Sequence, residues 1–457
     1  MLFHTSLLLC VCAVCVCVVG ASPRLHFQTD RLSSSDATFS VMQITDTHIY
    51  TDPESSTVIR TMEQLYYLVQ IYRPDMLVLT GDVTSNTVED TKRIHVEMCQ
   101  LPYMVTFGNH DSDAMSDYPF EGWREELLSH IETECGGDDS LFLGGVFEDS
   151  PTSTEGKGTD YVVPVYADSD SDDVAALVWA FDSHSHYCEG EHTVYGCIEH
   201  TQAQWASGIV SSTYTDASGS VPPSLAFFHI PTAQWDIRVD GDTGIATAYP
   251  EGDTVTIAGE RGEGISWSKK ETGILEELLA ALGNTYAMSV GHDHFNSYCL
   301  ETPLAIQPAS ADRPVALCYG GKMGVSSYWK DQVLSGCRMF ELTLSPSSAL
   351  SIETYLVRES QSLESKWVEE VFRVILEAGQ SMVRGIDVPE AHWRVLPDEW
   401  MFLWVAVLLV VVLVLYVSMS VVYKCAPAMK KRETHNAWTG SVSTSSVHQT
   451  GAAAAVV

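Results

Sequence analysis

The chain has 457 residues, of which 45% are hydrophobic, and its formal net charge at pH 7 is −35. This length is enough for one large domain, or two ordinary ones, with a sizeable core. The acidic balance excludes nucleic acid as an expected partner, because phosphate backbones are bound by Lys and Arg, and it disfavours docking by charge onto anionic lipid. A phosphate site in such a chain needs a local source of positive charge, which metal ions can supply.

An apolar segment over residues 5–20 opens the chain, and the small residues Gly20, Ala21 and Ser22 follow it. This pattern is typical of a secretory signal peptide, so we predict that residues 1–21 are removed. The segment lacks Lys and Arg at its front end, which leaves a retained signal anchor as the alternative.

Residues 22–357 are predicted to form one folded domain. Three apolar runs predict buried strands at 39–45, 76–80 and 103–107. Apolar residues recur at helical spacing from Val58 to Tyr72, and a second helix is predicted over residues 88–99. This β-α-β-α-β order indicates a parallel core sheet. We also predict strands at 176–181, 225–228 and 286–290, a long loop at 238–264 and a closing hairpin at 341–357.

A second apolar segment, residues 401–423, carries no charge and would span about 34 Å as a helix. Aromatic residues flank it, and basic residues follow its end. These features predict a transmembrane helix over 400–423 in a single-pass type I membrane protein, with the folded domain extracellular or in an endomembrane lumen. A core helix is the alternative. We expect a juxtamembrane stalk with an amphipathic helix at 358–399, and a disordered cytoplasmic tail at 424–457.

Seven of the twelve cysteines lie between the two apolar segments. This part of the chain is predicted to be outside the cytosol, where disulfides form. We predict a disulfide between Cys188 and Cys197, which bracket a short loop, and a second one between Cys299 and Cys318. Seven is an odd number, so at least one thiol is free or pairs between chains.

A set of oxygen and nitrogen donors follows the predicted strands: Asp46, His48, Asp82, Asn109, His229, His292 and His294. The carboxyl ends of parallel strands meet at one edge of a sheet, so these donors are expected to converge. Carboxylate and imidazole ligands suit hard and borderline metals, and a hydrolase that clamps a phosphate needs two cations about 3.5–4 Å apart. Each histidine alone is better explained as a core or loop residue, and only the ordered set indicates a two-metal site.

The order of these motifs, DTH, GD, GNHD, FFHIP and GHDH, resembles the calcineurin-like metallophosphoesterase superfamily. More closely, it is similar to the short, single-domain subgroup that resembles purple acid phosphatases. GEGIS at 262–266, GHDHFN at 291–296 and LCYG at 317–320 support this resemblance, which covers roughly residues 38–345. It implies an α/β fold, namely a four-layer α/β/β/α sandwich with two mixed β-sheets.

The resemblance also implies roles for individual residues. One metal would be held by Asp46, His48, Asp82 and His294, and the other by Asp82, Asn109, His229 and His292. Asp82 would bridge the two metals. His110 matches the catalytic His of the family, and Asp111 would orient its ring. The nucleophile would be a metal-bound hydroxide, because cations lower the pKa of water.

The chain departs from the true purple enzymes at two positions. Ser85 stands where they have the tyrosine that ligates ferric iron, and His48 stands where they have glycine. We expect His48 to replace the tyrosine ligand, so the protein should be colourless. The pair of divalent or mixed-valence ions, chosen from Fe, Zn and Mn, stays open.

Other residues carry weaker signals. Lys322 is a candidate for binding a substrate phosphate, and a surface lysine is the alternative. Glu263 is a candidate for lining the pocket. His184, His186 and His192 lie around Cys188. They suggest a zinc site, but a loop rim explains their spacing better.

The leading hypothesis is therefore a phosphatase that hydrolyses phosphomonoesters outside the cytosol. A phosphodiesterase or pyrophosphatase acting on nucleotides or lipid head groups would use the same metal core. A catalytically silent receptor on this scaffold is the third hypothesis, and the intact ligand set together with His110 argues against it.

Overall fold

The computed structural model describes most of the chain between residues 24 and 358 and one short segment near the C-terminus. The described residues are 24–29, 36–49, 56–84, 94–95, 101–111, 123–135, 142–143, 152–153, 156–157, 159–239, 246–248, 254–255, 257–270, 273–301, 314–325, 335–346, 350–358 and 438–440. They all belong to one compact unit.

The first mixed sheet has the strand order β21-β20-β19-β2-β3-β4, with β1 paired to β2. Its strands are β1 (Gln28–Thr29), β2 (Ala37–Ile44), β3 (Met76–Thr80), β4 (Tyr103–Thr106), β19 (Gly336–Leu344), β20 (Leu350–Arg358) and β21 (Trp438–Gly440). Strands β2, β3 and β4 run parallel, as the β-α-β-α-β order predicted. Strands β19 and β20 form the predicted closing hairpin.

The second mixed sheet has the order β15-β17-β18-β16-β11-β8-β7. Its strands are β7 (Tyr161–Tyr166), β8 (Val174–Ala180), β11 (Ser224–Phe227), β15 (Ile257–Ala258), β16 (Thr285–Val290), β17 (Cys299–Glu301) and β18 (Ala316–Tyr319). Its central strands β8, β11, β16 and β18 run parallel, and all but β18 coincide with predicted strands.

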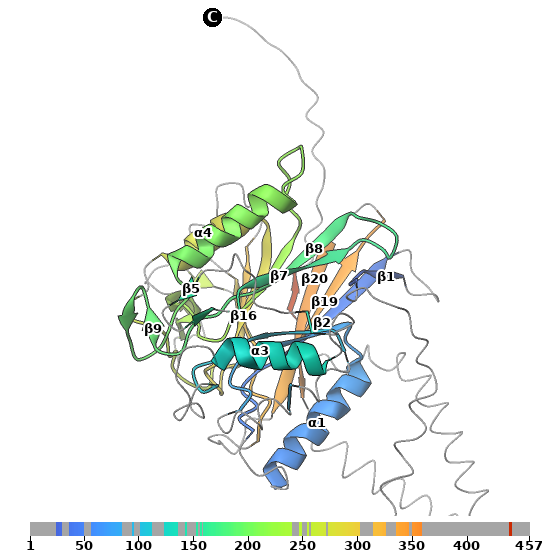
Figure 1. Ribbon diagram of the computed structural model, residues 1–457. Helices are drawn as coiled ribbons and strands as arrows, with labels where there is room; N and C mark the ends of the chain where they lie inside the picture. Colours follow the sequence, from blue (N-terminus) through green and yellow to red (C-terminus); the bar gives the residue numbers. More distant parts are fainter. Residues whose placement is uncertain are drawn as a thin grey trace, which may run out of the picture. The chain divides into compact units, whose positions relative to one another are not determined.

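The two sheets pack against each other through one apolar core, to which Phe39 and Val41 contribute from the first sheet and Leu225 and Phe227 from the second. Helices α1 (Ser56–Tyr72) and α3 (Trp123–Glu134) pack on the first sheet in a separate core. Helices α4 (His200–Ile209) and α5 (Ile274–Leu282) pack on the second sheet in a third core. Figure 1 labels α1, α3 and α4. The predicted α/β fold with two mixed sheets is confirmed.

Helix α1 follows directly from the sequence pattern. Val58, Met62 and Leu65 lie at helical spacing and are buried, whereas Tyr67 on the opposite side is exposed. Pro74 comes just after the helix and cannot continue it, because it has no N–H for the backbone ladder. The predicted helix from residue 58 to 72 is confirmed.

The predicted loop at 238–264 contains more structure than expected. Strands β12 (Ile237–Val239), β13 (Ala246–Ala248) and β14 (Thr254–Val255) form a small antiparallel sheet there. Strands this short do not produce the alternation on which a prediction from sequence depends. Two further hairpins are equally short: β5 (Thr152–Ser153) with β6 (Gly156–Lys157), and β9 (Tyr187–Cys188) with β10 (Glu191–His192).

Both predicted disulfides, Cys188–Cys197 and Cys299–Cys318, are present. The second joins directly paired residues of β17 and β18. Cys337 is a buried free thiol, which accounts for the odd cysteine count, and Cys135 is also disulfide-bonded.

Within the described residues, no helix is both long enough and apolar enough to cross a membrane. The predicted signal peptide, the stalk beyond Arg358 and the span at 401–423 lie outside these residues, as does most of the predicted helix at 88–99. Strand β21 lies in the predicted disordered tail, where its backbone pairs with β20.

Candidate metal centre

The seven predicted donors lie on loops that leave the ends of parallel strands in both sheets. Asp46 and His48 follow β2, Asp82 follows β3, and Asn109 follows β4. His229 follows β11 of the second sheet, and His292 and His294 follow β16. All seven side chains are buried. The two sheets thus bring together residues that are up to about 250 positions apart in the chain.

Four of these donors have a left-handed backbone conformation. The φ angles are 52° for Asp46, 41° for His48, 52° for Asp82 and 74° for His292. Non-glycine residues seldom adopt positive φ, and each such residue costs on the order of 1–3 kcal/mol. The fold therefore holds these turns in place against their local preference, a pattern that is concentrated at functional sites.

Glycines let the ligand loops approach each other, both within the first sheet and between the two sheets. A Cβ atom at Gly108 would lie 2.2 Å from Oδ1 of Asp82, and one at Gly291 would lie 2.0 Å from Oγ1 of Thr45. Neither position has room for a side chain, so the glycines of the GNHD and GHDH motifs are required by packing.

The donors form two clusters that share Asp82. Donor atoms of Asp46, His48, Asp82 and His294 all lie within 4.8 Å of one another, and those of Asp82, His229 and His292 do so as well. In the first cluster, Nε2 of His294 lies 3.0 Å from Nε2 of His48 and 3.4 Å from Oδ1 of Asp46. In the second, Nε2 of His229 lies 3.2 Å from Oδ2 of Asp82.

The hydrogen bonds of the histidines in the second cluster fit a cation. Nδ1 of His229 donates to the Thr80 carbonyl at 2.7 Å, which directs Nε2 toward Asp82. Nε2 of His292 is buried and has no hydrogen-bond partner among the described residues. An unsatisfied buried polar atom costs about 1–3 kcal/mol, which a bound cation would offset.

The protonation states also fit. Burial lowers the pKa of His48 to about 4 and that of His292 to about 3, so both imidazoles are neutral at pH 7. Burial opposes ionisation of Asp46, but the hydrogen bond and charge of His294 lower its pKa to about 2. For Asp82, His229 likewise outweighs burial and lowers the pKa well below its usual range. The chain thus presents ionised carboxylates and, at His48 and His292, neutral imidazoles, which are the states that a metal requires. At His229 the charge of Asp82 outweighs burial and raises the pKa to about 10, so a cation has to displace the proton of this ring.

His110 lies next to this site, and Asp111 has a different role from the predicted one. The His110 ring centroid is 5.3 Å from that of His48, and its backbone N–H donates to Oδ1 of Asp82. The Asp111 carboxylate accepts backbone N–H groups of four residues: Asp82, Val83, Thr84 and Gly108. Four bonds fill its acceptor positions, so Asp111 joins the loops after β3 and β4 and does not orient the His110 ring.

Lys322 and Glu263 lie close to the centre, and their roles in phosphate binding and pocket lining stay predictions. Lys322 is buried, and its backbone pairs with Thr45 next to Asp46. Burial lowers the pKa of Lys322 to about 8, and the negative charges of Asp46 and Glu263 act against this decrease. Glu263 accepts the Phe295 backbone N–H at 2.7 Å and lines an open hollow of about 490 Å³.

The three histidines around Cys188 do not gather into a zinc site. His184 is buried, whereas His192 is exposed and packs edge-to-face against Tyr187. Nδ1 of His186 contacts the Val194 carbonyl at 2.8 Å. In the part of the chain that the structure describes, the two clusters sharing Asp82 are the only groups of three or more donors suited to a metal.

Sequence reasoning missed two residues at the site. The Asp293 carboxylate accepts the Ser266 backbone N–H and the Tyr319 hydroxyl, and so fixes the turn between His292 and His294. Tyr195 contacts the His292 ring, although no local pattern marks it and almost a hundred residues separate the two. The GHDH motif itself was the available signal for Asp293. Ser85, on which the prediction of a colourless protein rests, lies outside the described residues.

Comparison with known proteins identifies relatives. The profile of the calcineurin-like phosphoesterases matches residues 39–296. The chain is 23% identical over 366 residues to "Probable inactive purple acid phosphatase 28" of Arabidopsis thaliana, an alignment that spans 75% of this chain and 84% of the relative. It is 23% identical over 359 residues to "Probable inactive purple acid phosphatase 29" of the same plant, spanning 71% and 80%. It is also 23% identical to "Phosphatase DCR2" of Saccharomyces cerevisiae over 66% of this chain but 51% of that protein.

Proposed function

Because the chain belongs to the calcineurin-like phosphoesterase family, we propose that it is a two-cation phosphatase that hydrolyses phosphomonoesters. The observation that carries the proposal is the pair of buried donor clusters that share Asp82. A shared carboxylate is what a bridging ligand requires, and two cations held side by side can clamp a phosphate between them.

In this proposal each donor has a defined part. One cation is held by Asp46, His48, Asp82 and His294, and the other by Asp82, Asn109, His229 and His292. Fe, Zn and Mn all accept this mixture of imidazole, carboxylate and amide ligands, so the donor set leaves the choice among them open. When bound, the cations supply positive charge to the phosphate and lower the pKa of water.

The chain's own residues would orient the ester and move a proton. His110 is half-buried beside His48 and would donate a hydrogen bond to the phosphate and a proton to the leaving oxygen. Lys322, with its charge near Asp46, would bind a phosphate oxygen. Burial of the donor loops excludes water around the phosphate and strengthens these electrostatic contacts.

A phosphodiesterase or pyrophosphatase would use the same donors, so the ratio of activities on a monoester and a diester separates these possibilities. The relatives' names differ on activity, since two are called probable inactive purple acid phosphatases and one is called a phosphatase. The complete donor set of this chain favours activity over a silent receptor.

We also propose that the folded domain works outside the cytosol, anchored by residues 401–423. The disulfides Cys188–Cys197 and Cys299–Cys318 support this location, because such bonds form and persist in oxidising compartments.

The test uses the full-length protein in detergent, loaded in turn with iron, zinc and manganese and assayed with p-nitrophenyl phosphate and its bis ester. We expect hydrolysis that favours the monoester, and a loss of at least about 1000-fold in Asp82→Asn, which keeps the side-chain shape but weakens the shared ligand. The matched control is Asp172→Asn, whose side chain is 98% exposed. Protein that binds two cations and cleaves neither ester would favour the silent receptor.

A further inference from the structure

Tyr195 contacts the candidate metal centre from a loop that supplies none of the predicted ligands. Its ring centroid lies 4.6 Å from that of His292, at an interplanar angle of 77°. On the same imidazole, the His229 ring lies 5.2 Å away at 70°. The His292 ring therefore has an edge-to-face neighbour in each of these two rings.

These contacts matter because no described residue gives the His292 ring the hydrogen bond that usually orients a metal-binding histidine. Metal-binding histidines normally donate the second ring N–H to a carboxylate, a carbonyl or water, which fixes the ring. His229 does this through its bond to Thr80. Among the described residues, neither ring nitrogen of His292 has a hydrogen-bond partner; only its backbone N–H is bonded, to Asp46. Among the described residues, packing against the Tyr195 and His229 rings therefore sets the direction of Nε2.

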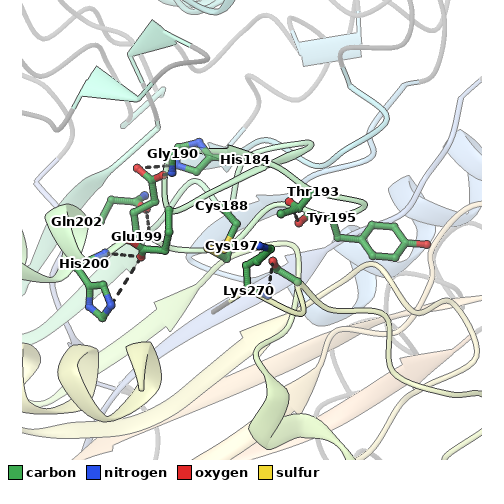
Figure 2. The surroundings of a disulfide bond; sticks show 12 residues. His184, Cys188, Gly190, Thr193, Tyr195, Cys197, Glu199, His200, Gln202 and Lys270 are labelled. Atoms are coloured by element: carbon green, nitrogen blue, oxygen red, sulfur yellow. Dashed lines mark hydrogen bonds and ion pairs between the residues drawn. A yellow bond between two sulfur atoms is a disulfide. The ribbon is translucent and has the colours of Figure 1, made fainter. Parts of the chain in front are cut away.

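The loop that carries Tyr195 is closed by the Cys188–Cys197 disulfide and fixed at both ends (Figure 2). The backbone N–H of Gly196 donates to the Ser185 carbonyl at 3.0 Å, and that of Cys197 donates to the Tyr187 carbonyl at 3.2 Å. In Figure 2 the Tyr195 side chain points away from the disulfide. A loop that is closed covalently loses less conformational entropy when it holds this ring in place.

The same loop cannot move away from the sheet without losing close packing. A Cβ at Gly196 would lie 2.3 Å from the Ser183 carbonyl oxygen, so the backbone next to Tyr195 lies directly against the segment after β8. At the outer edge, Lys270 pairs with Glu191 at 2.6 Å, which ties the hairpin to the segment after β15. This outer pair is solvent-exposed and contributes little by itself.

We propose that Tyr195 is a positioning residue for His292 and that the disulfide-closed loop 188–197 holds its ring in place. This inference rests on the proposed function only in that His292 is taken as a ligand of the cation bound with His229. Loss of the ring should lower the affinity for that one cation. The affinity for the cation bound by Asp46, His48 and His294 should not change.

The test is a titration of the full-length, chelator-stripped protein with Co²⁺. Binding is measured by calorimetry and by the ligand-field absorption of the bound ion. Wild type is expected to bind two ions. In Tyr195→Ala the affinity for one of them should fall about tenfold or more, the typical cost of losing an orienting partner. Tyr195→Phe retains the ring and should restore wild-type affinity. Val194→Ala is the matched control, because this neighbouring residue is 75% exposed.

A second comparison tests the loop. The double substitution of Cys188→Ser with Cys197→Ser should lower the affinity for the same Co²⁺ ion. Adding Tyr195→Ala should cause no further loss of affinity, because both changes act through one ring. Circular dichroism checks that each variant is folded. If the alanine variant does not fold, Tyr195→Leu replaces it, because leucine removes the ring but keeps part of the side-chain volume.

The inference is overturned if Tyr195→Ala or Tyr195→Leu binds both ions as wild type does, or if Tyr195→Phe loses as much affinity as Tyr195→Ala. These outcomes are distinct from failure of the proposed function. Wild type that binds two Co²⁺ ions but hydrolyses no ester would contradict the phosphatase proposal and leave the role of Tyr195 intact.

Discussion

At the scale of single residues, Asp111 shows how a motif position can be essential without touching a reacting atom. Its carboxylate accepts four backbone N–H groups from the two loops that carry Asp82 and Asn109. In Asp111→Asn the side-chain NH₂ group, itself a donor, would face backbone N–H donors and could not accept their hydrogen bonds. We expect the free energy of unfolding to fall by about 3 kcal/mol, since buried N–H groups would be left unsatisfied. Urea unfolding of the full chain measures this.

Asp172→Asn is again the matched control for Asp111→Asn, because its exposed carboxylate should change stability by less than about 0.5 kcal/mol. The alternative role for Asp111, orienting the His110 ring, makes the opposite prediction. It requires a lower kcat together with an unchanged free energy of unfolding, and that combination would refute the assignment made from the hydrogen bonds.

His229 should make the free energy of unfolding of the metal-free protein depend on pH. Burial alone would lower its pKa, but the charge of Asp82 raises it to about 10, whereas the unfolded value is near 6.5. From pH 7 to pH 8 the folded state therefore keeps a proton that the unfolded state has released. Stability should fall with rising pH by about 1.4 kcal/mol per pH unit in this window.

Thermal unfolding of chelator-treated protein between pH 7 and pH 8 measures this slope. His48 and His292 contribute little to this slope, because burial lowers their pKa values and both are largely neutral in this window, folded or unfolded. Burial raises the pKa values of Asp111 and Asp293 to about 7, which adds to the fall in stability, and lowers that of Lys322 to about 8, which opposes it. His229→Gln should remove most of the slope, as should saturating Co²⁺, which takes the place of the proton on Nε2. An unchanged slope in His229→Gln would mean that another group is responsible.

At the scale of elements, the site depends on how closely the loop after β16 approaches the loop after β2. A Cβ at Gly291 would meet Oγ1 of Thr45 at 2.0 Å and Oδ2 of Asp46 at 2.8 Å. Gly291→Ala must therefore displace a ligand loop, and we expect cation affinity to fall about 10- to 100-fold while the fold is retained. Titration with Co²⁺ measures the affinity.

Gly264→Ala provides the matched control for Gly291→Ala. A Cβ at Gly264 meets nothing within 4 Å, although this glycine belongs to the GEGIS segment beside the site. Equal losses of affinity in the two variants would show that backbone flexibility, and not the close approach of the loops, determines cation binding.

The elements also show what could be predicted from the sequence. Each donor stands directly after an apolar strand, so its place at a strand end followed from the pattern alone. The contact of Tyr195 with His292 could not be predicted, because it depends on how a disulfide loop folds over the second sheet. The role of Asp111 was equally hidden, since its partners are backbone groups that the sequence does not distinguish. Short strands such as β13 escaped prediction because they carry no periodicity.

At the scale of the whole molecule, the pairing of strand β21 with β20 is incompatible with the proposed membrane anchor. The backbone of Trp438–Gly440 pairs with Ile352–Thr354 of β20. A chain that crosses a membrane at residues 401–423 places these two strands on opposite sides. The anchor segment contains five Leu, nine Val and one Phe, for which bilayer insertion is favourable by about 5–9 kcal/mol in total. A short edge pair is worth about 3 kcal/mol, so the anchor should prevail and the pair should be absent in the membrane-bound protein.

The single cysteine of the tail, Cys425, reports this topology. In sealed, right-side-out membrane vesicles we expect a membrane-impermeant maleimide to leave Cys425 unlabelled until detergent is added, because the tail is on the cytosolic side. The folded domain of the same molecules should be cut by protease added outside. Replacing Val411 and Val412 with Asp at the centre of the span disfavours insertion, because each charge there costs about 2.5–3.5 kcal/mol. This variant should be released from the membrane, and its Cys425 should be labelled by the maleimide without detergent. Labelling of Cys425 in intact vesicles of the wild-type protein would instead place the tail beside β20 and rule out the type I arrangement.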